Sequence, residues 1–247
     1  MSHIIHQVAF YLHVSVGCFA LIVFWLPLFA KKGSKPHLRY GRWFANSMFI
    51  IAVSGVLLTT LALMDPIGVR TPERNLSFEA ATRMAEGYRE FSWFLLMLSV
   101  LVFNSTYHSI QVLRAKANRQ LMRNWKHLSL IIGLFLLSIV TAIIGTLEGM
   151  LLLQVFAGLS LANSIGMAHY IYKAEIKQRE WILAHMRGIV GSGIGAYTAF
   201  FAFGGRQLFA ELLTGNLMVI PWILPAVIGV ISMSAFKKKY IQQYRIA

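Results

Sequence analysis

The sequence predicts an all-α membrane protein, a single bundle of seven transmembrane helices that extends over residues 1–247. Three observations lead to this prediction. The chain is 57% hydrophobic and only 13% charged, and a soluble domain is usually about 25% charged. Seven apolar runs are each long enough to cross a bilayer as a helix. Basic residues gather in the segments between alternate runs, as they do in cytoplasmic loops.

The predicted spans follow one another closely. Only the neighbourhood of Glu148 separates the fourth from the fifth, which predicts a tight helical hairpin. The seventh span contains Pro221 and Pro225, which predict a kink. The seven spans are residues 8–30, 43–64, 91–113, 128–147, 149–172, 186–204 and 217–236.

Loop charge predicts the orientation of the bundle. Segments 31–42, 114–126, 173–187 and 237–247 together hold 18 of the 23 Lys and Arg residues. The opposite side of the predicted membrane holds seven of the nine acidic residues. By the positive-inside rule the four basic segments are cytoplasmic, which places the N-terminus outside and the C-terminus in the cytoplasm.

The formal net charge of +14 would also suit a nucleic-acid-binding protein. We expect no nucleic-acid partner, because the positive charges lie in loops between apolar runs. Such loops favour contact with anionic membrane lipid instead. No Lys or Arg precedes Lys31, so we also expect no cleaved signal peptide.

Eight histidines are the residues most able to carry chemistry, because a histidine inside hydrocarbon is costly and needs a partner. The predicted topology sorts them into two layers. The outer layer contains His3, His6 and His13. The inner layer contains His37, His108, His127, His169 and His185.

Three kinds of chemistry fit these histidines. Two imidazoles on facing helices can ligate a haem iron from both sides. The candidate haem ligands are His13, His37, His108, His169 and His185. Three or more imidazoles can hold zinc, or iron together with carboxylates or water. The candidate metal ligands are His108, His127, His169 and His185. Histidines without a metal can relay protons, and the simplest alternative is that they only pack against neighbouring polar groups.

Small residues mark two of the predicted spans. Gly17 lies four residues after His13, on the same helix face, and leaves room for a flat macrocycle there. In the sixth span, Gly188 and Ser192 are also four apart, as are Gly191 and Gly195. This spacing favours the close approach of a second helix.

The start of the chain has a distinctive order of residues: Leu12-His13, Gly17, Ala20-Leu21, and then a basic loop with His37 and Gly41-Arg42. This order resembles the opening of the bacterial membrane proteins grouped as domain-of-unknown-function family 2306. Residues 184–187 resemble the later histidine-led span of that family, although the Arg expected near its end is absent at Phe200-Phe201. The resemblance covers the first two spans and the sixth. It implies a multi-pass protein of a bacterial cytoplasmic (inner) membrane and marks His13, His37 and His185, but it implies no settled activity.

Three functional hypotheses follow. The first is a b-type haem protein of electron transport, which passes electrons between a quinol or a cytoplasmic reductant and an acceptor. The second is a metal-dependent membrane hydrolase or hydroxylase that holds zinc or iron on the inner histidines. The third is a non-enzymatic small-molecule transporter or accessory membrane subunit, in which the histidines relay protons or pack. The sequence assigns neither a catalytic residue nor an oligomeric state.

Overall fold

The structure is a computed structural model that describes residues 2–71, 75–204, 217, 220–244 and 246. Every regular element in these ranges is a helix, and no strand occurs in them. Six of the described helices are long and apolar enough to cross a membrane. These observations agree with the all-α, membrane-protein class predicted from the composition.

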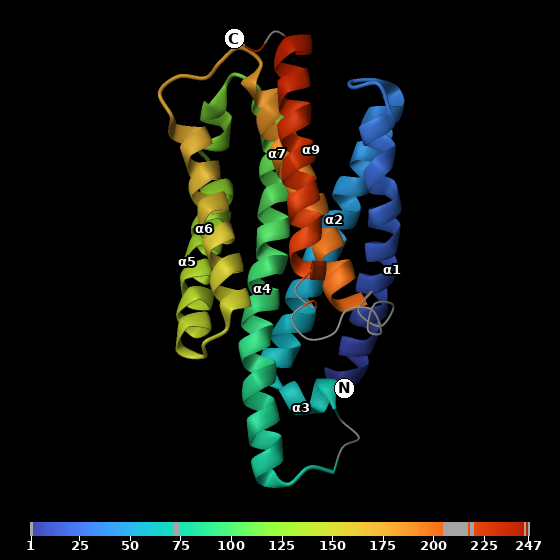
Figure 1. Ribbon diagram of the computed structural model, residues 1–247, viewed down its shortest axis with the longest axis vertical. Coiled ribbons are helices and arrows are strands. Elements are labelled where there is room, and N and C mark those ends of the chain that lie inside the picture. Colours follow the sequence, from blue (N-terminus) through green and yellow to red (C-terminus); the bar gives the residue numbers. More distant parts are fainter. Residues whose placement is uncertain (1, 72–74, 205–216, 218–219, 245, 247) are drawn as a thin grey trace. The chain divides into compact units, whose positions relative to one another are not determined.

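The six candidate spans are the long helices α1, α2, α4, α5, α6 and α9 (Figure 1). Their bounds are Ser2–Phe29, Lys35–Met64, Phe78–Ala115, Trp125–Leu147, Leu151–Tyr172 and Ile220–Tyr244, in that order. Short helical segments connect some of them: α3 (Pro66–Arg70), the 3₁₀ turn η1 (Arg119–Met122) and the π-helical turn η2 (Phe200–Gly204).

A seventh long helix, α7 (Glu180–Ala199), overlaps the predicted span 186–204 but is not among the six candidate spans. Glu180, Arg187 and several glycines interrupt the apolar residues of this helix. The count of seven spans therefore stays a prediction, as does the orientation of the termini.

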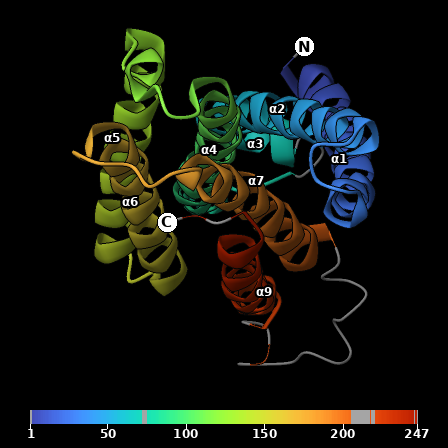
Figure 2. The same cartoon turned by 90° about the horizontal axis from the view of Figure 1, so that it is seen from above.

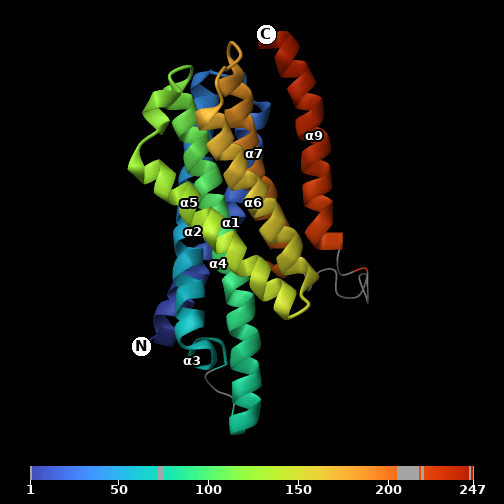
Figure 3. The ribbon, with the colours of Figure 1, turned by 90° about the vertical axis from the view of Figure 1, so that its left-hand side faces the viewer.

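Helix α4 is longer than its predicted span of 91–113, since it begins at Phe78 (Figure 3). No proline interrupts residues 78–115, so the helix continues without a break from residues 78–90 into the apolar run.

Helices α5 and α6 form the predicted tight hairpin, and Figure 2 shows them side by side. Gly149 has a φ of +64°, a left-handed conformation that favours glycine. The Met150 amide donates to the Gly145 carbonyl at 2.8 Å, and the Gly149 amide donates to the Thr146 carbonyl at 3.4 Å. This pattern of two bonds closes the C-terminus of α5 and turns the chain directly into α6.

Contacts divide the chain into two compact units, each built from several helices. The first unit comprises Met1–Val16, Phe49–Asn104 and Leu128–Ala168. The second unit comprises Gly17–Met48, Ser105–His127 and His169–Ala247. The prediction of a single domain over residues 1–247 stays a prediction.

Each unit has its own packing pattern. In the first unit, the buried Phe94 lies against Phe156, and the Ser138 hydroxyl donates to the Ser160 hydroxyl at 2.8 Å between α5 and α6. In the second unit, the ring of Phe24 packs on Gly193 of α7, where a Cβ atom would collide with it. Glycine at this position therefore lets α1 and α7 approach closely.

Candidate functional site

The C-terminal part of α4 is polar yet buried, and it forms the centre of the candidate site within the second unit. Ser105, Thr106, His108 and Ser109 are all buried. Small side chains on this face let α7 come close: a Cβ atom on Gly188 would lie 2.8 Å from the Ser105 carbonyl oxygen and from the Ser109 Cβ. Buried polar groups need hydrogen-bond partners, and the side chains of this stretch of α4 find several of theirs on α5 and α7.

The main feature of the site is a direct hydrogen bond between two histidines. Nδ1 of His108 lies 3.2 Å from Nε2 of His127. The side chains are almost fully enclosed, with exposures of 5% for His108 and 0% for His127. Since each neutral imidazole has one N–H and one bare nitrogen, one ring donates to the other and the pair shares a single hydrogen.

Local chain structure fixes the position of His127. The Oδ1 atom of Asn124 accepts a hydrogen bond from the His127 backbone amide at 3.0 Å. Asn124 therefore acts as the N-cap of α5, with His127 at the third helical position. The cap holds the first turn of α5 in place, and with it the histidine ring.

Two tyrosines enclose the histidine pair. The ring of Tyr107 lies edge-on to His127, and the ring of Tyr170 lies edge-on to His108 at a centroid distance of 5.8 Å. The buried Tyr170 hydroxyl has no hydrogen-bond partner among the described residues. Nδ1 of His127 also lacks a well-formed hydrogen bond, although the Met122 carbonyl lies near the ring. Buried polar atoms of this kind are commonly satisfied by water.

His185 on α7 is held by the neighbouring residue Ser109. The Ser109 hydroxyl donates to the His185 carbonyl at 2.9 Å. Nδ1 of His185 lies 2.8 Å from that hydroxyl oxygen and 3.2 Å from the Ser109 carbonyl. Because the hydroxyl hydrogen is already used, Nδ1 of His185 is the donor and Nε2 keeps its lone pair.

His37 has the same tautomer for a similar reason. Its Nδ1 donates to the Pro27 carbonyl at 3.0 Å. Lys32 caps the same end of α1, where its Nζ donates to the Pro27 and Leu28 carbonyls. Burial, and secondly the charge of Lys239, lower the pKa of Lys32. Both Lys32 and His37 lie near His185.

The remaining two candidates lie elsewhere. His13 belongs to the first unit, where its Nδ1 lies 2.9 Å from the Ser54 hydroxyl. That hydroxyl donates to the Ile50 carbonyl at 2.7 Å, so the histidine is the donor in the first contact. His169 is exposed. No group of three or more His, Cys, Asp or Glu side chains that could hold a metal ion occurs in the part of the chain that the structure describes.

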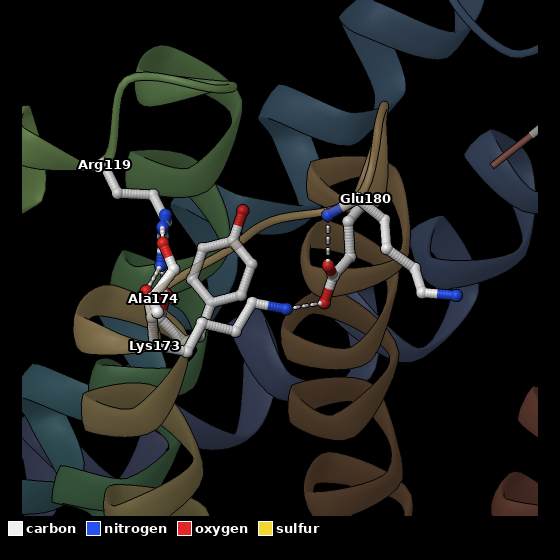
Figure 4. A network of polar contacts seen from close by, with 6 residues as sticks. Arg119, Lys173, Ala174 and Glu180 are labelled. Atoms are coloured by element: carbon white, nitrogen blue, oxygen red, sulfur yellow. Dashed lines mark hydrogen bonds and ion pairs between the residues drawn. The ribbon is translucent and has the colours of Figure 1, made fainter. Parts of the chain in front are cut away.

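A polar network with Arg119, Lys173 and Glu180 lies at the C-terminal end of α6 (Figure 4). Tyr170 of the same helix contacts His108 of the histidine pair. Arg119 donates from Nη1 to the Tyr170 and Lys173 carbonyls, and from Nη2 to the Ala174 carbonyl. Lys173 forms an ion pair with Glu180 at the start of α7. Glu180 precedes the predicted span 186–204. Its partial burial acts to raise its pKa, but the hydrogen bonds from Lys173 and from the Lys177 amide outweigh burial, so this pKa is lowered.

The sequence indicates the histidines as candidate site residues, but most of the residues that position them are evident only in the structure. Asn124 carried a usable signal, since asparagine directly before an apolar run is a common N-cap. The sequence has no comparable signal for Ser109, Tyr170 and Arg119, because it does not show which residues of other helices these side chains contact.

No family model, no curated protein and no solved structure matches this chain. The resemblance to the domain-of-unknown-function family therefore remains a prediction from the residues that carry it.

Proposed function

We propose that the protein is a non-enzymatic membrane protein in which the histidine pair relays protons, as a proton-coupled transporter or an accessory subunit does. The observation that carries this proposal is the hydrogen bond between His108 and His127, at 3.2 Å and enclosed by the second unit. Two imidazoles joined through one hydrogen form the shortest relay that histidines can build.

The chemistry of the relay follows from the four ring nitrogens. When His127 donates to His108, a proton that binds Nδ1 of His127 makes that ring an imidazolium. The shared hydrogen can then pass from Nε2 of His127 to Nδ1 of His108, and His108 releases its own Nε2 proton. One proton enters, one leaves, and both rings end in the opposite tautomer. Nδ1 of His127, which lacks a well-formed bond, is the natural entry atom.

The proposal includes the predicted topology: seven spans in a bacterial inner membrane, with the N-terminus outside. Helix α7 has 20 residues and is about 30 Å long at 1.5 Å per residue, which matches a hydrocarbon core. The four basic segments then lie in the cytoplasm. A fluorescent protein fused to either terminus fluoresces only when that terminus is cytoplasmic. We expect a fluorescent C-terminal fusion and a dark N-terminal fusion.

Proton flux into proteoliposomes tests the relay. With a pH-sensitive dye inside, we expect vesicles carrying the protein to acidify faster than empty vesicles after an external acid pulse. His108→Gln and His127→Gln should each remove the difference, because each breaks the pair. His169→Gln is the matched control, since His169 is exposed. Equal rates with and without the protein would count against a relay that conducts by itself.

A second candidate, haem b held by His37 and His185, is favoured by a different observation. Both rings donate from Nδ1 to a backbone carbonyl, of Pro27 and Ser109. Ligating histidines usually have this arrangement, because the carbonyl fixes the tautomer and leaves Nε2 for the metal. Bound haem would supply one-electron chemistry, in exchange with a quinone or another redox partner. Lys32 and Lys239 would offer positive charge to its carboxylates.

The directly bonded pair fits axial ligation less well. An iron between His108 and His127 would need their nitrogens about 4 Å apart, twice a metal–nitrogen bond of about 2 Å. Haem supplementation followed by an absorption spectrum tests the second candidate. A Soret band that disappears in His37→Gln and His185→Gln, but not in His108→Gln, would support it. A colourless wild-type protein would remove it.

A further inference from the structure

Basic and aromatic side chains form contacts near the ends of four helices in the second unit. Each contact places a guanidinium or ammonium group over an aromatic ring. Four of the pairs are Arg39 with Trp43 at 4.8 Å, Arg123 with Tyr172 at 4.9 Å, Lys126 with Trp125 at 5.8 Å and Lys116 with Trp181 at 6.0 Å. A fifth pair, Lys173 with the buried Tyr170 at 5.9 Å, is set apart because Lys173 already forms an ion pair with Glu180. A cation held over an aromatic ring at these distances is attracted by the ring and kept in place.

Three of these rings are open to the surroundings of the second unit. The exposures are 39% for Trp43, 51% for Tyr172 and 74% for Trp125. All three lie in the first or last turns of candidate membrane spans, or within about two turns of their ends. Tryptophan and tyrosine at such positions usually lie at headgroup depth, where an amphipathic ring is most stable.

Charge at this end of the second unit is strongly one-sided. Segments 31–42, 114–126, 173–187 and 237–244 contain 17 basic residues but only two acidic ones, Glu175 and Glu180. Glu180 is already paired with Lys173. In the first unit, the one such contact that involves described residues is Arg70 with Tyr88. The excess of positive charge therefore coincides with the exposed aromatic rings.

Two arginines of the same loop illustrate the difference between a structural cation and a ligand-binding one. Arg119 directs three hydrogen bonds at the carbonyls that end α6. Arg123 lies over the exposed ring of Tyr172, with one long hydrogen bond of 3.5 Å to the Ile171 carbonyl. A guanidinium has five N–H donors, and those directed outward suit phosphate oxygens.

We propose that the pairs at Arg39, Arg123, Lys126 and Lys116 bind the headgroups of anionic phospholipids in the cytoplasmic leaflet. The cation attracts the phosphate, and the ring beside it lies at the level of the glycerol and upper acyl chain. Free phosphate would need no exposed ring, and so the phospholipid is the occupant that uses both halves of each pair. The proposal is independent of the histidine relay.

Nanodiscs of phosphatidylglycerol and of phosphatidylcholine test this proposal. We expect wild-type protein to melt at a higher temperature in phosphatidylglycerol, and native mass spectrometry to detect retained phosphatidylglycerol molecules. The double variant Arg39→Gln/Arg123→Gln should retain fewer of them and lose roughly 2 to 4 °C per arginine in phosphatidylglycerol only. Lys237→Gln/Lys238→Gln is the matched control, because it removes the same charge from exposed positions of α9.

Three outcomes would overturn the proposal. One is equal stability of the wild type in both lipids. Another is an equal loss of lipid in the control variant, which would indicate unspecific charge attraction. The third is displacement of the retained lipid by millimolar inorganic phosphate, which would indicate a free-anion site. Circular dichroism of each variant in phosphatidylcholine checks that it is folded, so that a folding defect is not read as lost binding.

Discussion

Nδ1 of His108 and Nε2 of His127 lie 3.2 Å apart between α4 and α5, inside the second unit. The two residues are 19 positions apart in the sequence and belong to different helices. Three features position the residues around this contact: the start of α5, the close approach of α7 to α4, and the polar network at the end of α6. Each of these supports can be tested separately.

The N-cap of α5 is the first support. Asn124→Ala removes the acceptor of the His127 amide hydrogen bond, which we expect to destabilise the protein by about 1 kcal/mol. Asn118→Ala is the matched control, because Asn118 precedes η1 without a side-chain capping bond. Thermal unfolding in one fixed lipid composition measures both. Equal melting temperatures of the two variants would contradict the assigned role of Asn124.

The contact of α7 with α4 is the second support. Gly188→Ala would place a Cβ atom 2.8 Å from the Ser105 carbonyl oxygen and from the Ser109 Cβ. We expect α7 to move away from α4, with a loss of about 1–3 kcal/mol. Gly191→Ala should be tolerated, since a Cβ atom there meets nothing within 4 Å. Melting temperatures that fall equally in both variants would show that the helix approach is not specific to Gly188.

The ion pair between Lys173 and Glu180 predicts a dependence of stability on pH. Folding lowers the pKa of Glu180 from its ordinary value of 4.5. Its contribution to the free energy of unfolding is therefore fully present at a pH above the pKa of the unfolded state, and it is lost as the pH falls through the lower pKa of the folded state. Glu180→Gln should therefore destabilise the protein at pH 7 and lose that effect in strong acid. The control is Glu175→Gln, at an exposed position of the same loop. A destabilisation by Glu180→Gln that persists unchanged in strong acid would argue against the ion pair.

Arg119 predicts a difference between two cations. Arg119→Lys keeps the charge but loses the planar fork that reaches the Tyr170, Lys173 and Ala174 carbonyls. We expect a loss of about 1.5–3 kcal/mol, the range for hydrogen bonds to charged groups. Arg114→Lys, on the exposed last turn of α4, should change little. Chemical unfolding measures the free energy of unfolding of both variants. An unchanged value for Arg119→Lys would mean that positive charge alone stabilises the C-terminal end of α6.

Most of the helices could be predicted from the sequence, because an apolar run of bilayer length, or a turn residue such as Gly149, determines the structure of its own segment alone. The hairpin between α5 and α6 needs only those runs and one residue of positive φ. Helix α7 lies in a predicted span but is not among the six candidate spans, and Glu180 and Arg187 interrupt its apolar residues. The start of α4 at Phe78 also differs from the predicted start at residue 91, because residues 78–90 include charged side chains and do not belong to an apolar run.

The candidate site could be predicted only in part. The free-energy cost of placing a histidine in a membrane indicates that each histidine needs a partner, but it does not show which two are in contact. The pairing of His108 with His127 depends on how α4 and α5 are rotated about their axes, which the sequence does not show. The exposure of His169 is a further example, because a position one turn from a helix end can face either way.

Nitrogen-15 NMR of histidine-labelled protein in nanodiscs tests the central claim most directly. The account predicts magnetisation transfer between one nitrogen of His108 and one of His127 through their shared hydrogen, absent in His127→Gln and retained in His169→Gln. It also predicts that the two rings take up protons in linked steps, since a proton on one changes the other. Absence of transfer at every pH, with two rings that titrate independently, would contradict a shared hydrogen and the relay built on it.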